Sequence, residues 1–77
     1  MKSLGDKLLE ASMKFSFICL NKLKKKERLG WTGWDNPKNR KILESRFTEH
    51  IKKPLTQDNL VDIANFCGFL WHLIENE

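Results

Sequence analysis

The chain has 77 residues, a length that allows one domain. Apolar residues make up 40% of it and charged residues 31%, with four glycines and two prolines, which excludes a disordered, collagen-like or low-complexity protein. Lysine and arginine outnumber aspartate and glutamate by 14 to 10, so the formal net charge of +4 weakly favours an anionic partner.

Neither disulfide chemistry nor a membrane span is expected. Cys19 and Cys67 are too few and too far apart for a disulfide framework or a zinc site. No stretch reaches the roughly 18 uninterrupted apolar residues that a membrane-spanning helix needs. Four charged residues between positions 6 and 14 interrupt the apolar stretch near the start, whereas a signal peptide has a continuous apolar core. We therefore expect a cytoplasmic protein.

The first predicted helix covers residues 3–28. Ser3 followed by Asp6 is the pattern of a capping box, in which the hydroxyl and the carboxylate satisfy free amides at a helix start. Apolar residues then recur at spacings of three or four, as on one helix face, and the pattern stops at Gly30. The stripe consists of Leu4, Leu8, Ala11, Phe15 and Ile18, widened on one side by Leu9, Met13, Phe17 and Leu20.

A loop over residues 30–36 separates this helix from a second one, predicted over residues 36–53. The loop sequence, Gly-Trp-Thr-Gly-Trp-Asp-Asn, followed by Pro37, is rich in residues that favour turns. Asp35 or Asn36 would cap the second helix, with Pro37 in its first turn, and Pro54 would end it. Its apolar stripe consists of Leu43, Phe47 and Ile51, with Ile42 beside them.

The third predicted helix covers residues 56–75 and begins at a cap formed by Thr56 or Asp58. It is apolar nearly all round, which is typical of a helix buried on several sides. Three helices in one chain cannot easily provide that cover, so we expect a second copy to supply it. One face holds Leu60, Ile63, Ala64, Cys67, Leu70, Trp71 and Ile74, and the opposite side holds Val61, Phe66, Phe69 and Leu73. The predicted fold is an all-α bundle of about three helices in a single domain, 1–77, assembled as a dimer or higher oligomer.

A basic run closes the first helix. Cations there complement the helix dipole and keep the surface soluble. The alternative is a phosphate-binding patch, whose affinity would fall steeply with salt. The run consists of Lys22, Lys24, Lys25, Lys26 and Arg28.

Two tryptophans, Trp31 and Trp34, lie beside flexible glycines and Asp35 in the predicted loop. An indole ring can stack on a nucleobase or cover the open end of a helical core. Two of them in one glycine loop favour contact with a ligand, and the hydrophobic lid stays open as the alternative.

Catalytic motifs are missing from the sequence. It has no phosphate-binding glycine loop ending in lysine, no His-Glu-x-x-His and no serine framed by glycines. His50 and His72 have no second histidine at metal-binding spacing on a helix. We therefore predict no catalytic residue, no metal site and no cofactor.

Two short segments carry a family resemblance: Gly-Trp-Thr-Gly-Trp-Asp at positions 30–35 and Val-Asp-Ile-Ala-Asn-Phe at positions 61–66. They resemble the small all-α MazG-like nucleotide pyrophosphohydrolases of phages and bacteria, which include dATP/dGTP diphosphohydrolase-like proteins. The likeness covers roughly residues 28–74. Active members of that family hold Mg²⁺ with a Glu-x-x-Glu pair on one helix and a Glu-x-x-Asp pair on the next.

Carried over to this chain, the first pair falls on Glu49 and Lys52 and the second on Asn59 and Asp62. Two of four carboxylates remain, and the ammonium group of Lys52 would repel the metal, which prefers hard oxygen ligands. The resemblance therefore implies a degenerate metal site and a protein that is not an enzyme, with a residual pyrophosphohydrolase as the last alternative.

Such a protein could still bind a nucleotide. Lys52 would neutralise phosphate, Asn65 would hydrogen-bond a base or sugar, and a tryptophan would stack on the base. Asp62 and Asn65 have the alternative role of tying helices together. The expected ligand-binding residues are Trp31, Trp34, Asp35, Lys52, Asp62 and Asn65.

The expected function is therefore that of a non-enzymatic phage-type protein that binds a nucleotide or a nucleotide-like anionic ligand. It would sequester a host-defence nucleotide signal in the host cytoplasm. Two alternatives stay open. One is an inhibitor or adaptor that contacts a host defence protein through the apolar third helix, and the other is nucleic-acid binding through the basic run.

Overall fold

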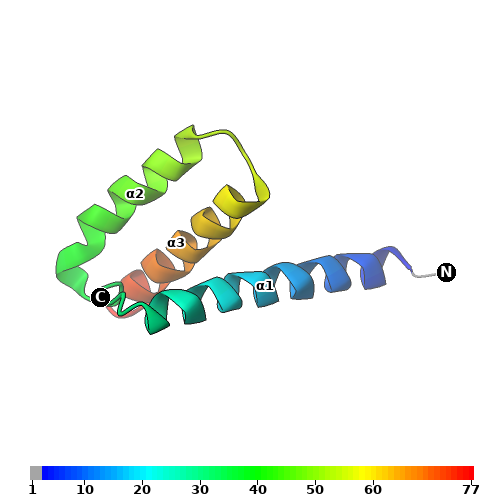
Figure 1. Ribbon diagram of the computed structural model, residues 1–77, viewed down its shortest axis with the longest axis horizontal. Coiled ribbons are helices and arrows are strands. Elements are labelled where there is room, and N and C mark those ends of the chain that lie inside the picture. Colours follow the sequence, from blue (N-terminus) through cyan, green and yellow to red (C-terminus); the bar gives the residue numbers. More distant parts are fainter. Residues whose placement is uncertain (1–2) are drawn as a thin grey trace.

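The computed structural model describes residues 3–77. The chain forms α1 (Leu4–Arg28), the short 3₁₀-helix η1 (Pro37–Asn39), α2 (Arg40–Lys52) and α3 (Gln57–Glu75), as shown in Figure 1. Residues 3–77 contain no strand, so the predicted all-α fold of three helices is confirmed. The second helix differs from its prediction over 36–53, because its first residues form a 3₁₀ turn and the α-helix begins only at Arg40. None of the described helices is long and apolar enough to cross a bilayer.

Side-chain caps fix where the helices begin. The capping box predicted at the start of α1 is present, with Ser3 and the aspartate three residues later each accepting the other's amide. Asn36, rather than Asp35, caps η1 by accepting a hydrogen bond from the amide two residues later at 3.0 Å. Thr56, rather than Asp58, caps α3 by accepting the amide three residues later at 3.1 Å. These contacts are local, which is why the sequence predicts the helix starts well.

The end of α1 is a glycine turn that reverses the chain. Gly30 has φ +81°, a conformation that costs glycine little and other residues much. Its amide donates to the Glu27 carbonyl and the Trp31 amide to the Lys26 carbonyl, each at 3.0 Å. This pair of crossed hydrogen bonds is the Schellman motif, which satisfies the free carbonyls of a helix end. It also holds Trp31 next to the last turn of α1.

The hydrophobic core lies between α2 and α3, which run antiparallel (Figure 1). Leu43 of α2 is buried against three residues of α3, namely Phe66, Phe69 and Leu73. Partly buried side chains from all three α-helices and the loop pack around this core. They are Leu23 of α1, Trp31 and Trp34 of the loop, Phe47 of α2 and Leu70 of α3.

The two apolar sides of α3 therefore have different environments. Phe69 and Leu73 do not need a second copy to cover them, because they are only 6% and 4% exposed within the chain's own core. The side opposite that core is left open, with Trp71 and Ile74 exposed near the end of the helix. The buried side is the one that faces the stripe of α2.

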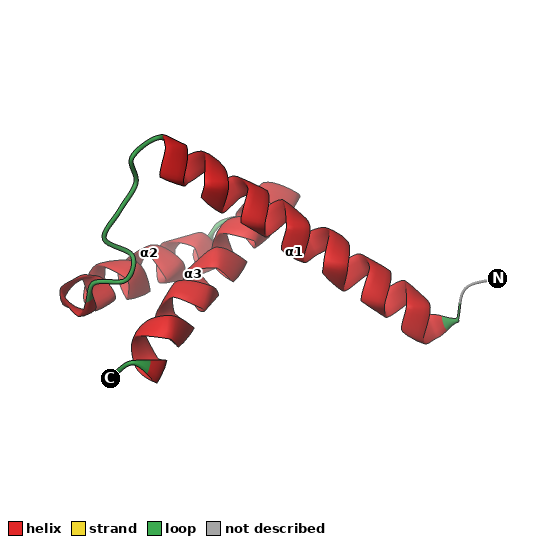
Figure 2. Cartoon of the chain, turned by 90° about the horizontal axis from the view of Figure 1, so that it is seen from below, coloured by secondary structure: helices red, strands yellow, loops and turns green. Residues whose placement is uncertain are grey.

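α1 packs on α3, and its N-terminal part projects from the body of the molecule (Figures 1 and 2). A cavity of about 590 Å³ lies between Ala11, Phe15 and Ile18 of α1 and the first turns of α3. Every residue from Ser3 to Ile18 is exposed, and no residue of α1 is fully buried. We call residues 4–18 the arm. Much of the apolar stripe of α1 is thus exposed along the arm, most strongly at Leu4 and Leu8.

Candidate functional site

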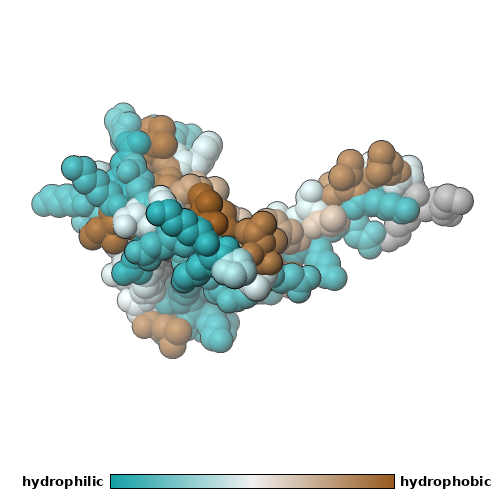
Figure 3. All heavy atoms as spheres, turned by 90° about the horizontal axis from the view of Figure 1, so that it is seen from above, coloured by the Kyte–Doolittle hydropathy of each residue, from teal (hydrophilic) through white to brown (hydrophobic). Residues whose placement is uncertain are grey.

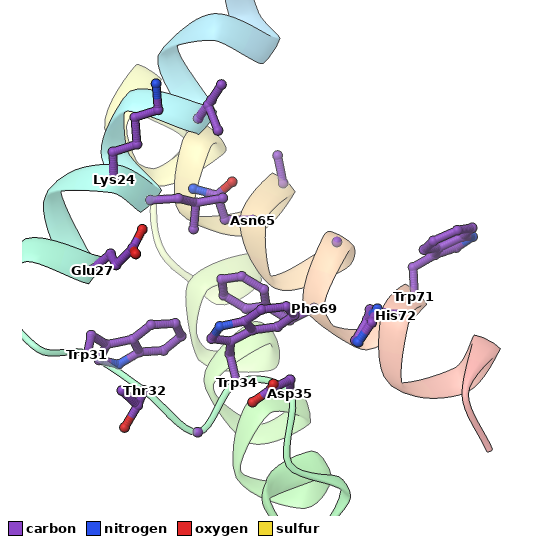
Figure 4. A pocket seen from close by; sticks show the side chains of 15 residues that line it. Lys24, Glu27, Trp31, Thr32, Trp34, Asp35, Asn65, Phe69, Trp71 and His72 are labelled. Carbon is purple, nitrogen blue, oxygen red and sulfur yellow. The ribbon is translucent and has the colours of Figure 1, made fainter.

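A cavity lies where α1, the loop and α3 meet. Its volume is about 820 Å³, which falls within the range of small-molecule sites. We call it the tryptophan cavity (Figure 4). It is lined by Lys24 and Glu27 of α1, by Trp31, Trp34 and Asp35 of the loop, and by Asn65, Phe69, Trp71 and His72 of α3, among others.

Trp31 and Trp34 cover the core and line the cavity at once. The centroids of their rings lie 5.3 and 5.5 Å from that of Phe69, so both indoles pack on one phenyl ring. The ring of Trp34 also lies 5.2 Å from that of His72. Figure 4 shows the two loop indoles next to each other on the same side of α3, and Trp71 apart from this group. The lid and the ligand-contact roles predicted for these residues are therefore compatible.

The loop backbone and a lysine hold the indoles in place. Lys26 Nζ lies 5.2 Å from the Trp31 ring centroid, within reach of a cation–π interaction. Gly33 has φ +92°, and a Cβ atom there would lie 2.9 Å from Asn39 Nδ2. The same Asn39 amide donates to the Gly33 carbonyl at 2.8 Å. Glycine is thus required at position 33, directly before Trp34.

The tryptophan cavity is lined by charged side chains of both signs. Lys24 supplies one cation, and Glu27 and Asp35 supply two carboxylates. Asn65 is buried and its amide donates to the Cys19 carbonyl at 3.4 Å, which ties α3 to α1. The predicted tying role of Asn65 is therefore present together with its place in the cavity wall.

The structure brings four of the six predicted ligand-binding residues together and leaves two elsewhere. Trp31, Trp34, Asp35 and Asn65 line the tryptophan cavity, but Lys52 does not. Lys52 is the exposed last residue of α2, far along the chain from the loop. Asp62 lines a second cavity of about 640 Å³, lined also by Glu49 and His50 of α2.

Asp62 is engaged in an ion pair. Its carboxylate lies 2.5 Å from Lys22 Nζ, which also contacts Asp58 at 2.9 Å. Burial lowers the pKa of Lys22, but the hydrogen bonds to both carboxylates outweigh it and leave this pKa raised. The hydrogen bond to Lys22 lowers the pKa of Asp58. The stabilisation from Asp58 is therefore complete above its ordinary pKa and is lost as the pH falls through the lowered value.

Asn59, at another position where the resemblance implies a metal ligand, is a structural residue. It is 8% exposed, and its amide donates to the His50 carbonyl at 2.8 Å. Its Oδ1 lies 2.7 Å from His50 Nδ1, which places the proton on that nitrogen. Asn59 thus joins the end of α2 to the start of α3.

A metal site is not assembled from these positions. In the described range 3–77, no group of three His, Cys, Asp or Glu side chains is arranged to hold a metal ion. Glu49 and Asp62 line the same cavity, but Lys22 already neutralises the second carboxylate. The basic side chains Lys26, Lys41 and Arg46 line that cavity too, and they oppose the entry of a cation.

The basic run does not form one surface. Lys22 faces the aspartates of α3, Lys24 lines the tryptophan cavity, and Lys26 lies over Trp31. Lys25 and Arg28 are exposed in the last turn of α1. Neighbouring residues of a helix point about 100° apart, which distributes five successive cations around the helix.

Phe69 and His72 are site residues that the sequence analysis did not single out. They lie four and seven positions after Asn65 and so share its helix face. Once Asn65 is chosen as a site residue, this periodicity indicates both of them. Phe69 matters most, because both loop indoles pack on its ring.

Replacing Lys22 with methionine should lower the free energy of unfolding by about 1 kcal/mol, the upper range for partly exposed pairs. The Asp62 side chain is only 15% exposed and would lose its cation. Lys25→Met, at an exposed position three residues later, is the matched control and should change stability by less than about 0.5 kcal/mol. Urea unfolding of both variants measures the difference. Equal losses would show that the ion pair contributes nothing.

Comparisons with protein-family models, with curated proteins and with solved structures found no match for this chain. The MazG-like resemblance therefore rests on two short segments alone, and the function proposed below rests on the geometry of the tryptophan cavity.

Proposed function

We propose that this protein binds a nucleotide or a nucleotide-like molecule, and that the tryptophan cavity takes its base. The observation that carries the proposal is the arrangement of Trp31 and Trp34 against Phe69 at the wall of an 820 Å³ cavity. Aromatic rings provide a stacking surface for any planar heteroaromatic ring. Asn65, in the same wall, offers amide chemistry that suits a base edge.

The charges of the cavity favour recognition through the ring rather than through phosphate. Lys24 is the cation among the lining residues, and the two carboxylates Glu27 and Asp35 outnumber it. Lys52, the residue expected to neutralise phosphate, lies outside the cavity. We therefore expect a nucleoside to bind nearly as well as its monophosphate.

Binding without catalysis is the second part of the proposal. It is supported by the engagement of Asp62 with Lys22 and of Asn59 with His50, at two positions where related hydrolases would place metal ligands. A small protein of this kind would act by sequestering its ligand, and a host-defence nucleotide signal is one ligand of the proposed class.

If the protein is an inhibitor or adaptor, the surface that contacts its partner has to be one that the chain leaves exposed. Phe66, Phe69 and Leu73 of α3 are buried inside the chain, so an adaptor would have to use the exposed side of α3 near Trp71 or the arm. Nucleic-acid binding through the basic run is less well supported, because these cations face in different directions and Lys22 is already paired.

The proposal is tested by titrating tryptophan fluorescence with three probes: adenosine, adenosine 5′-monophosphate and pyrophosphate. We expect the first two to change the emission with similar affinity and pyrophosphate to leave it unchanged. Stacking on an aromatic side chain contributes about 1–3 kcal/mol per base, so Trp31→Ala or Trp34→Ala should weaken binding by about 5- to 150-fold. Lys52→Ala, outside the cavity, is the control and should bind like the wild type.

Stability must be measured on the same samples, because both indoles also cover the core. If both tryptophan variants lose stability while each folded molecule keeps its affinity, the indoles are only a lid and the proposal fails. A response to pyrophosphate alone would contradict the assignment of the cavity to the base.

A further inference from the structure

The arm has a large apolar surface that the rest of the chain does not cover. Leu8, Leu9 and Met13 are 62%, 60% and 63% exposed, and Leu4 and Phe17 are similarly open. Figure 3 shows the arm projecting from the body with hydrophobic side chains gathered along it. An apolar surface of this extent on a small protein marks an interaction site.

The size of the excess surface fits a second copy of the chain. A compact monomer of 9.1 kDa has about 4,900 Å² of accessible surface, whereas this chain exposes 6361 Å². Its radius of gyration is 14.4 Å, against about 11.5 Å for a compact chain of 77 residues. The excess of about 1,500 Å² per chain exceeds the roughly 800 Å² that each partner buries in a standard interface.

The arm also has a line of small residues along which another helix can approach closely. At about 100° per residue, Gly5, Ser12 and Ser16 point in one direction, between the apolar residues Leu8 and Leu9. The same line continues to Cys19, whose carbonyl accepts the Asn65 hydrogen bond from α3. α3 thus covers the C-terminal part of this line, and its N-terminal part is free. We call positions 5, 12 and 16 the seam.

Packing against a partner would stabilise the helical conformation of the arm. Isolated helices shorter than about 12–15 residues are marginal in water, even when they are rich in alanine. The arm contains a glycine, two serines and two phenylalanines, which are weaker helix formers. Packing of its apolar side against another surface would supply the missing stability.

We propose that two copies of this chain associate through their arms, packed antiparallel along the seam. Such a contact is symmetric, so each arm covers the apolar surface of the other and the assembly closes as a dimer. The antiparallel direction follows from charge, because it keeps the two runs at residues 22–28, each with five cations and one glutamate, at opposite ends. A parallel pair would bring these like charges side by side.

The charge of the arm also argues against a lipid surface as the occupant. Helices that lie on membranes carry mainly lysine and arginine on their polar side. The polar side of the arm instead holds two acidic and two basic residues, Asp6, Lys7, Glu10 and Lys14. A net charge of zero gives no attraction to anionic lipid.

Sedimentation equilibrium of the full chain over a range of concentrations tests the dimer. We expect the wild type to sediment at twice the mass of one chain, about 18 kDa, at micromolar concentration. The double variant Leu8→Glu/Leu9→Glu, on both sides of the seam, should sediment as a monomer. Lys7→Glu, on the opposite side of the helix, changes the net charge by the same amount and should remain a dimer.

Fluorescence of the packed tryptophans shows whether a monomeric variant keeps its folded body, because the arm does not contact Phe69. A wild type that is monomeric at these concentrations overturns the proposal. So does a double variant that remains dimeric with its body folded. A monomeric wild type that binds vesicles of phosphatidylcholine and phosphatidylglycerol would assign the arm to a lipid surface instead.

The direction of pairing is tested by disulfide formation in a chain with Cys19→Ala and Cys67→Ser. Position 12 lies next to the middle of the arm, so an antiparallel pair brings its two copies together. We therefore expect the Ser12→Cys variant to form a cross-linked dimer on oxidation. Gly5→Cys lies on the same seam, but its two copies would be about 18 Å apart along the axis, too far for a disulfide. Cross-linking of both variants would establish a parallel pair and overturn the proposed direction.

Discussion

Replacing Phe69 with alanine should remove a large part of the stability of this protein. Phe69 is 6% exposed, belongs to the buried core and supports the rings of both Trp31 and Trp34. Truncation of a buried phenylalanine costs about 3–5 kcal/mol. A chain of this length has a total stability of about 4–12 kcal/mol, so the loss is a large share of that total and should lower the urea midpoint strongly.

Urea unfolding followed by far-ultraviolet circular dichroism measures this effect. Trp71→Ala is the matched control, because Trp71 is a large aromatic residue on the same helix that is 65% exposed. We expect it to change the free energy of unfolding by less than about 0.5 kcal/mol. A similar loss in both variants would mean that the core is not organised around Phe69.

The second large effect is expected at Asn59. Its replacement by alanine removes the donor to the His50 carbonyl and the acceptor for His50 Nδ1, in a site that is nearly closed to water. The His50 carbonyl keeps the Lys53 amide as a donor at 3.3 Å, but His50 Nδ1 loses its acceptor. Leaving a buried polar group without a partner costs about 1–3 kcal/mol, so we expect a loss of about 2 kcal/mol.

Asn76→Ala provides the comparison for this prediction. Asn76 also donates its side-chain amide to a backbone carbonyl, that of His72 at 2.8 Å, but it is exposed at the end of α3. Thermal unfolding of the two variants should show a clear fall in melting temperature for Asn59→Ala and little change for Asn76→Ala. A fully stable Asn59→Ala variant would show that the hydrogen bonds to His50 do not stabilise the junction of α2 and α3.

Local chemistry explains why the sequence predicts the helices well. The caps at Ser3, Asn36 and Thr56 and the turn at Gly30 depend on residues within a few positions of one another. The start of α2 is the exception. The residues after Pro37 have no side-chain cap for an α-helix and adopt a 3₁₀ turn first.

Long-range contacts explain what the sequence could not predict. Both sides of α3 are apolar, and the choice of the buried side depends on where Leu43 of α2 meets it. The partner of Asp62 is Lys22, forty positions earlier, and no local pattern indicates that pair. The resemblance places Lys52 at the ligand because Lys52 follows Glu49 by three residues, as in the Glu-x-x-Glu pair of the family. This spacing predicts that both residues lie on α2, but it does not predict that α2 ends away from the loop.

The tryptophan cavity was predicted only in part for the same reason. Glycines and two indoles in one loop are a local signal, and this signal singles out the segment whose indoles pack on Phe69. The opposing wall is formed by Asn65, Phe69 and His72, whose shared helix face becomes meaningful only when the loop is known to pack there.

The binding role of the tryptophan cavity is tested most directly by the indole N–H signals in a proton–nitrogen correlation spectrum during titration with adenosine. The chain has three tryptophans, so three such signals are expected, each assignable by single substitution. The account predicts that the Trp31 and Trp34 signals shift together and saturate at the same adenosine concentration, with accompanying shifts at the amides of Asn65 and His72. Unchanged indole signals, or shifts confined to the basic residues 22–28, would contradict it.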